Sequence, residues 1–156
     1  MRASASIPIA ARPVRLLGRE LLDGGVADSI PVKWFEKQGF KKQIVVLTRP
    51  EGYVKKPMKF MPLIKLWLHG YPALVEGIRT RHLRYNGTLE YIKKLEASGS
   101  IFVIRPQHTM KTAIVERNPN RLREIYEAGR RDMSESLEAL QKFLIGENDG
   151  KENKQK

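Results

Sequence analysis

The apolar residues of this chain fall into short continuous runs and longer helical stripes. Two runs of four apolar residues, Ile-Val-Val-Leu at 44–47 and Ile-Phe-Val-Ile at 101–104, consist mainly of β-branched side chains. Continuous runs of this kind are typical of strands that are buried in a parallel sheet. The pattern therefore predicts two core strands of one parallel sheet, with helical segments between them.

Two longer segments have helical periodicity. Between residues 73 and 97, spacings of 4, 4, 3, 4 and 3 separate Leu74, Ile78, His82, Tyr85, Leu89 and Ile92. This predicts an amphipathic helix, in which Gly87 costs about 1 kcal/mol and can cause a break. A second helix is predicted from Asn118, a capping residue that is followed by Pro119. Its expected buried stripe consists of Leu122, Tyr126, Gly129, Met133, Leu137, Leu140 and Leu144. The glycine in that stripe indicates close packing.

The most apolar segment of the chain is 58–70, where Lys59 and Lys65 interrupt a run of large side chains that ends near Trp67. A core or lid helix is the favoured interpretation, because stripes of this kind usually face protein. The alternative is an interfacial patch, in which Trp and Lys side chains lie in the headgroup layer of a membrane.

The N-terminal part of the chain is expected to contain a hairpin and a short helix. Residues 14–22 predict two short strands around Gly18. Residues 31–38 predict a helix that has Pro31 in its first turn and ends at Gly39.

Asp23, Gly24 and Gly25 follow the predicted hairpin directly. Because glycine reaches positive φ without a steric penalty, this backbone can bend sharply and hold the carboxylate at the end of a strand. A carboxylate in that place can serve as a base, a metal ligand or a cap. On its own, however, an Asp-Gly pair favours an ordinary hairpin turn.

The surroundings of this motif resemble a known family. The matching segments, in order, are ASASIP at 3–8, DGGVADSIPV at 23–32, VVLTRP at 45–50, Tyr-Pro at 71–72, RHLRYN at 81–86 and IFVIRP at 101–106. The ordered set resembles the C-terminal half of the bacterial patatin-like phospholipases, which are lipid acyl hydrolases with a Ser–Asp dyad and no catalytic histidine. The resemblance implies an α/β fold, part of a three-layer α/β/α sandwich with a mainly parallel sheet. It also implies that Asp23 accepts the proton of the nucleophilic serine and that Gly24 and Gly25 shape its loop.

The family's nucleophile is expected in a G-x-S-x-G elbow that precedes these segments. In this chain only Gly146 and Gly150 are four residues apart, and Asn148 lies between them. The glycine-rich oxyanion loop has no counterpart either. We therefore expect residues 1–146 to form the C-terminal part of a phospholipase domain whose N-terminal part is missing. This chain is expected to be inactive alone. Residues 147–156 are expected to form a polar, disordered tail.

Other candidate groups near Asp23 are less suited to catalysis. Ser4, Ser6 and Ser29 lie close to it in sequence, but none is on a glycine-flanked elbow, so the sequence disfavours a nucleophile among them. Asp28 is the rival acid, and its place before Pro31 predicts a cap for the following helix.

Composition adds a second interpretation of function. The net charge is +12, and residues 33–59 carry eight cationic side chains against two acidic ones. An alternative function is a basic module that binds nucleic acid or an anionic membrane surface. Nucleic acid is disfavoured, because basic motifs interleaved with aromatic residues are missing.

The remaining expectations concern location and partners. The absence of cysteine excludes disulfides and thiolate metal sites and fits a reducing cytoplasm. No apolar run approaches the roughly 18 residues that span a bilayer, so a cytoplasmic protein with peripheral membrane contact is expected. The three histidines lack metal-ligand spacing, so no metal or other cofactor is expected. The expected partners are a lipid or acyl-ester substrate and a second copy that pairs through an open sheet edge.

Overall fold

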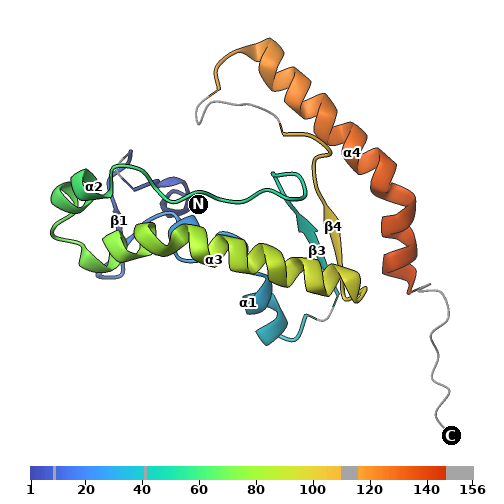
Figure 1. Ribbon diagram of the computed structural model, residues 1–156, viewed down its shortest axis with the longest axis horizontal. Helices are drawn as coiled ribbons and strands as arrows, with labels where there is room; N and C mark the ends of the chain where they lie inside the picture. The colour runs from blue at the N-terminus through green and yellow to red at the C-terminus, as the bar shows by residue number, and fades with distance from the viewer. Residues whose placement is uncertain (9, 41, 110–115, 147–156) are drawn as a thin grey trace, which may run out of the picture. The chain divides into compact units, whose positions relative to one another are not determined.

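The computed structural model describes residues 1–8, 10–40, 42–109 and 116–146, which form the helices and strands labelled in Figure 1. They divide into two compact units, and each is described by itself: Met1–Pro31 with Val54–Tyr91, and Val32–Tyr53 with Ile92–Lys156. Helices are combined with one antiparallel and one parallel pair of strands, which confirms a mixed α/β protein. The predicted tail, residues 147–156, lies outside the described residues.

The first unit begins with a 3₁₀ turn, η1 (Ala3–Ala5), and the predicted hairpin. Strands β1 (Val14–Leu16) and β2 (Arg19–Leu21) pair antiparallel, with Val14 opposite Leu21. The two residues between them, Leu17 and Gly18, both have positive φ, at 50° and 73°. Two-residue turns of this hand match the twist of the strands they join, so the hairpin prediction is confirmed.

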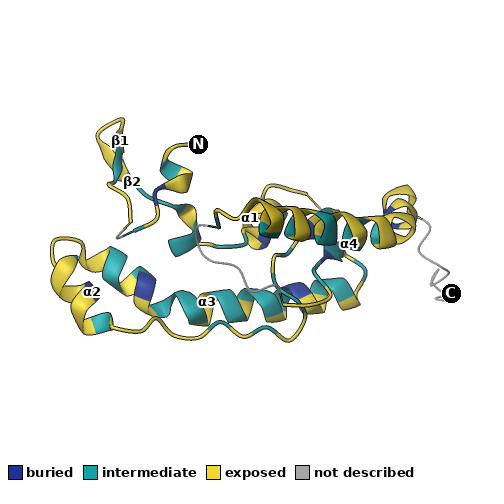
Figure 2. Cartoon of the chain, turned by 90° about the horizontal axis from the view of Figure 1, so that it is seen from above, coloured by how far each residue is buried: buried dark blue, intermediate teal, exposed yellow. Residues whose placement is uncertain are grey.

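Helix α2 (Met61–Trp67) confirms a helix in the most apolar segment, but most of its large side chains are not in a core. Ile64 is buried, whereas Leu63, Leu66 and Trp67 are exposed. Figure 2 shows this helix mostly in the colour of exposed residues. The core alternative is therefore wrong for these side chains, because no described part of the chain covers them. The lid and interfacial alternatives both remain.

Helix α3 (Pro72–Ala97) is the long helix predicted from the spacing of 73–97. It runs without a break through Asn86 and Gly87. Its predicted apolar stripe is buried or half-buried along its whole length, with Ile78 and Ile92 among the most buried residues. The structure thus confirms both the helix and the face that it buries.

The second unit contains the predicted parallel strands. Strand β3 (Gln43–Val46) pairs in parallel with β4 (Ile101–Ile104), and the amide of Leu47 continues the ladder to the carbonyl of Ile104 at 2.8 Å. Helix α1 (Val32–Lys37) precedes this pair and ends before Gly39, whose φ is 89°. The short helix and the parallel pairing are both confirmed. The prediction that both strands are buried is wrong for β3, because Ile44 and Val46 are exposed.

Helix α4 (Pro119–Ile145) begins as the sequence predicts. The side chain of Asn118 accepts hydrogen bonds from the amides of Asn120 and Arg121, and Pro119 occupies the first helical position. Gly146 ends the helix in the left-handed conformation, with φ 88°. The ammonium of Lys42 donates to the last free carbonyls, those of Phe143 and Leu144, where a cation also complements the helix dipole.

The predicted buried stripe of α4 is wrong in part. In the cluster where α4 packs against β4, the buried residues are Ile104, Leu140 and Phe143, and Phe102 and Met133 pack against them. Four residues of the predicted stripe are exposed instead: Leu122, Tyr126, Leu137 and Leu144. The helix carries apolar residues on more than one face, so spacing alone did not decide which face β4 would cover.

The expected close packing at Gly129 is also wrong. A Cβ atom on this residue would meet no other atom within 4 Å. Gly129 instead lines a cavity, which is described below.

The register of α4 can be tested with two neighbouring substitutions. Phe143 is 9% exposed and Leu144 is 53% exposed. Phe143→Ala is expected to lower the free energy of unfolding by about 3 kcal/mol, the usual cost of deleting a buried ring. Leu144→Ala, the matched control, should cost less than about 1 kcal/mol. Urea denaturation measures both values, and equal losses would contradict the observed register.

Candidate active-site loop

The candidate catalytic acid, Asp23, lies at the end of the hairpin. It is the second residue after β2, and its amide donates to the carbonyl of Ser6 at 2.9 Å. Its side chain caps the 3₁₀ turn η2 (Gly24–Val26), because Oδ1 accepts a hydrogen bond from the amide of Gly25 at 2.6 Å. The structure gives Oδ2 no hydrogen bond to any described residue. One oxygen thus positions the carboxylate, and the other is available to a reacting group.

The two glycines after Asp23 have a different role from the one expected. Neither adopts positive φ, so the expected left-handed conformation and the ordinary hairpin turn are both wrong. The chain does bend directly after Asp23, but it does so in a 3₁₀ turn. Gly25 is needed for space. A Cβ atom there would lie 2.9 Å from Oδ1 of Asp23 and 3.2 Å from a terminal nitrogen of Arg81. A Cβ atom on Gly24 would meet nothing within 4 Å.

Helix α3 holds this loop through the backbone carbonyls. Arg81 donates from Nε to the carbonyl of Gly25 at 2.6 Å, and the hydroxyl of Ser29 donates to the same oxygen at 2.7 Å. Arg84 donates to the next carbonyl, that of Val26, at 2.6 Å. Hydrogen bonds to charged donors contribute more than neutral ones, about 1.5–3 kcal/mol each.

The loop of Asp23 packs closely against helix α3 at Gly77. A Cβ atom on Gly77 would lie 3.1 Å from Cγ1 of Val26. Arg84 also donates to the carbonyl of Gly77 at 2.8 Å, so it joins the loop to the helix backbone. Analysis of the sequence did not assign Gly77, Arg81 and Arg84 to this site. Their spacing of four and three residues, which puts them on one helix face, is the signal that could have identified them.

Asn86 extends the same arrangement to the segment before α2. Its side-chain amide accepts from the amide of Lys55 at 2.8 Å and donates to the carbonyl of Lys55 at 3.0 Å. The ammonium of Lys55 lies 5.0 Å from the centre of the Tyr85 ring. Helix α3 therefore fixes the backbone of two irregular segments.

Two of the three serines that lie near Asp23 in sequence have engaged hydroxyls, and the third, Ser4, lies in η1. Ser6 is buried, and its hydroxyl donates to the carbonyl of Arg2 at 3.0 Å. Ser29 donates to Gly25 as described above. The role predicted for Asp28 is wrong: it accepts the amide of Ile30 at 3.1 Å in a local turn, whereas helix α1 begins at Val32.

A carboxylate at the base of the hairpin links it to α3. Glu20 accepts from the hydroxyl of Tyr71 at 3.0 Å and from Nε of Arg15 at 3.1 Å. The Tyr71 hydroxyl, and then the Arg15 guanidinium, lower the pKa of Glu20 below its usual value. The same hydrogen bond raises the pKa of Tyr71.

Metal and membrane-spanning elements are not found in the part of the chain that the structure describes. No group of three His, Cys, Asp or Glu residues is placed to hold a metal ion there. Nδ1 of His82 is buried and has no hydrogen-bond partner among the described residues. None of the described helices has the length and apolar character needed to cross a bilayer.

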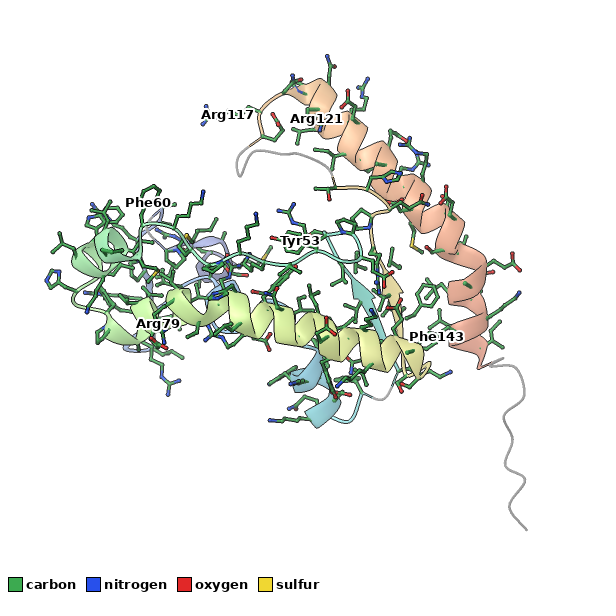
Figure 3. The ribbon with its side chains drawn as sticks, in the orientation of Figure 1. Tyr53, Phe60, Arg79, Arg117, Arg121 and Phe143 are labelled. Atoms are coloured by element: carbon green, nitrogen blue, oxygen red, sulfur yellow. The ribbon has the colours of Figure 1, made fainter. Side chains whose placement is uncertain are left out.

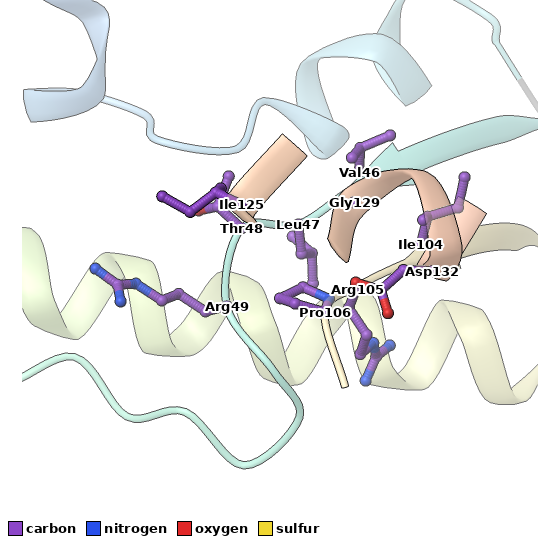
Figure 4. Close-up of a pocket in the computed structure, with 10 residues that line it drawn as sticks. All are labelled: Val46, Leu47, Thr48, Arg49, Ile104, Arg105, Pro106, Ile125, Gly129 and Asp132. Carbon is purple, nitrogen blue, oxygen red and sulfur yellow. The ribbon is translucent and has the colours of Figure 1, made fainter. Parts of the chain in front are cut away.

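The second unit contains a cavity of about 360 Å³ at the carboxyl ends of β3 and β4, between these strands and α4. Figure 4 shows its lining residues, which include Leu47, Arg105 and Gly129. The guanidinium of Arg105 is bound by the carboxylates of Glu96 and Glu51, so it supplies no free charge to a ligand. None of the site residues predicted from the sequence lines this cavity.

Comparison with known proteins identifies similar chains of uncharacterised function. Residues 71–145, which contain all of α3, β4 and α4, match the family of a domain of unknown function, DUF6363. The chain is also similar to the uncharacterized protein YjjU of Escherichia coli (strain K12), with 32% identity over 133 residues. That match covers 83% of this chain and 37% of YjjU, so the chain spans little more than a third of its relative.

The role of Gly25 gives a test with a built-in control. Gly25→Ala is expected to lower the free energy of unfolding by about 1 kcal/mol or more, because the new methyl group displaces the carboxylate that caps the loop. Gly24→Ala should be neutral or stabilise by up to about 1 kcal/mol, because its methyl group meets open space and alanine restricts the unfolded chain. Urea denaturation of both variants measures the difference. A loss at Gly24 that equals the loss at Gly25 would contradict this role.

Proposed function

We propose that this chain is the acid-bearing, C-terminal part of a patatin-like lipid acyl hydrolase, and that Asp23 is the proton acceptor of its Ser–Asp dyad. The observation that supports the proposal best is the loop of Asp23. One carboxylate oxygen is fixed by the amide of Gly25, and α3 holds the carbonyls of the following turn. The ordered sequence segments shared with that family provide the second support.

The proposed chemistry is acyl transfer. A serine on an upstream elbow attacks the carbonyl carbon of a lipid ester while Asp23 accepts its proton. The tetrahedral oxyanion is bound by backbone N–H groups of the upstream part, and Asp23 then returns the proton to the leaving alcohol. A carboxylate is a weak base at neutral pH, with an ordinary pKa of about 3.9. The reaction therefore depends on how well Asp23 is positioned, which is what the contacts from α3 provide.

The same proposal assigns the fold to the three-layer patatin-like sandwich. Two parallel strands rarely form a sheet alone, since parallel sheets are usually buried on both faces. Ile44 and Val46 of β3 are 45% and 68% exposed, a high value for β-branched residues of a parallel strand. An upstream part that adds strands and a covering layer would bury them.

Under this proposal the isolated chain has no nucleophile. Its substrate would be a lipid or acyl ester, which this chain and the upstream part would bind together. A cytoplasmic location at the membrane periphery belongs to the same proposal. In the absence of the upstream part, a second copy would be expected to pair with the open edge of the sheet.

The missing nucleophile is directly testable. The purified chain is expected to hydrolyse p-nitrophenyl esters no faster than buffer, and a fluorophosphonate probe should not label it. The physical reason is that Ser6 and Ser29 already donate to backbone carbonyls. Mass spectrometry of the probe-treated chain measures labelling, and stoichiometric modification of Ser4, Ser6 or Ser29 would contradict the proposal.

The role of Asp23 can be tested in a longer protein that joins this segment to an upstream G-x-S-x-G segment. Asp23→Asn keeps the oxygen that accepts the amide of Gly25 but removes the basicity of the side chain. It is expected to lower kcat by about 10²–10⁴-fold, the usual effect of losing a general base, without unfolding the protein.

Asp28→Asn is the matched control for that experiment. Asparagine can accept the same amide, that of Ile30, so the rate should change little. Steady-state ester hydrolysis measures both variants. An equal loss of rate in the two would show that Asp23 is not the base.

A further inference from the structure

Four large apolar side chains form an uncovered surface on and beside helix α2. Phe60, Leu63, Leu66 and Trp67, which we term the α2 face, are 64–76% exposed. Positions 60, 63 and 67 differ by three and four residues, and Leu66 lies next to them, so all four lie on one side of the helix. Figure 2 shows α2 as largely exposed, and Figure 3 shows Phe60 at the start of this helix.

The backbone keeps this surface exposed at a cost. Phe60 adopts a left-handed conformation, with φ 59° and ψ 33°, immediately before the first residue of α2. Bulky residues seldom occupy this region, and such strain is more common at functional positions than elsewhere. Ile64 is buried and anchors the helix, whereas the aromatic ring of Phe60 stays in solvent.

The charges in the segment that carries the α2 face have one sign. Residues 52–75 contain four lysines, Lys55, Lys56, Lys59 and Lys65, and no acidic residue. Lys59 and Lys65 are exposed beside the apolar side chains. A protein partner does not require a segment without acidic residues. An anionic bilayer attracts lysines near its surface and repels carboxylates, so it favours such a segment.

The apolar residues also fit a bilayer surface better than a protein core. Trp and Phe side chains that are flanked by lysine are typical of helices that lie in the plane of the headgroup layer. With seven residues, Met61–Trp67, helix α2 is far too short to span a membrane but long enough to insert one apolar face.

We propose that the α2 face binds the surface of an anionic lipid bilayer, with Phe60, Leu63, Leu66 and Trp67 inserted among the acyl chains and Lys59 and Lys65 at the headgroups. The inference rests on the proposed function for its biological role, but the binding itself needs no catalytic step. Its failure would leave the role of Asp23 unaffected, and an inactive dyad would leave the binding unaffected.

The two tryptophans of the chain allow a direct test with the 156-residue protein. Trp67 lies on the α2 face, and Trp34 lies on α1 and is also exposed. The Trp34→Phe variant, in which Trp67 is the single reporter, is mixed with vesicles of phosphatidylglycerol and phosphatidylcholine. Its emission should shift to shorter wavelength, and brominated acyl chains should quench it. The Trp67→Phe variant, which reports on Trp34, should show neither effect.

Vesicle flotation of matched double variants tests which side chains bind. Leu63→Ser with Leu66→Ser should weaken binding at least tenfold, because two apolar side chains no longer leave water. Leu122→Ser with Leu144→Ser alters two exposed leucines of α4 and should leave binding unchanged.

Lys59→Glu with Lys65→Glu should likewise weaken binding to anionic vesicles at least tenfold, and high salt should weaken binding of the unmodified chain. Lys93→Glu with Lys94→Glu makes the same change of net charge on exposed residues of α3 and should have a smaller effect. Circular dichroism confirms that each variant keeps its helices.

Three results would overturn the proposal. The first is no binding to vesicles that contain phosphatidylglycerol. The second is equal loss of binding in the α2 and control variants. The third is a dimer of the unmodified chain that does not bind vesicles. If sedimentation velocity shows that Leu63→Ser with Leu66→Ser dissociates this dimer, the α2 face binds a second copy instead of a bilayer.

Discussion

The first unit depends on one kind of interaction. Side chains on one face of helix α3 donate or accept hydrogen bonds to the backbone of neighbouring loops. Loops have few partners for their own amides and carbonyls, and a polar group that leaves water without a partner is costly. Arg81 and Arg84 supply partners for the turn after Asp23, and Asn86 does so for Lys55. The helix is continuous and its apolar stripe is buried or half-buried, so it can support these loops. The position of the Asp23 carboxylate follows from this support, not from the flexibility of two glycines.

The second unit is organised around a parallel pair of strands and one helix that packs on it. Strand β4 contacts α4 through the cluster of Ile104, Leu140 and Phe143, and Lys42 closes the end of α4. Strand β3 retains exposed apolar side chains, and so does the outer side of α4. Parallel sheets normally bury both faces, whereas in the described part of this unit one face of β3 is exposed.

Exposed apolar side chains therefore have two different settings in this protein. On β3, Ile44 and Val46 lie on one face of a parallel pair, and the occupant that physical reasoning favours is a layer that covers that face. On α2 they lie on a short helix among lysines, where the backbone before the helix is strained. Charge and geometry, more than apolar area, distinguish the two, and they lead to different proposals for what covers each surface.

The amino-acid sequence by itself determined the elements, because their causes are local. The hairpin follows from two short strand patterns around Gly18, the long helix from the spacing of its apolar residues, and the start of α4 from Asn118 and Pro119. It also singled out Asp23 as the candidate acid. Only the tertiary structure decided how that acid is held, which face of α4 is buried, and why position 25 is a glycine. Each of these depends on atoms that are distant in the chain: the guanidinium of Arg81 lies 56 residues from the carbonyl that it binds. The spacing of apolar residues predicts which residues share one side of a helix. Contacts between segments that are distant in the chain decide which side is covered and which side chains meet.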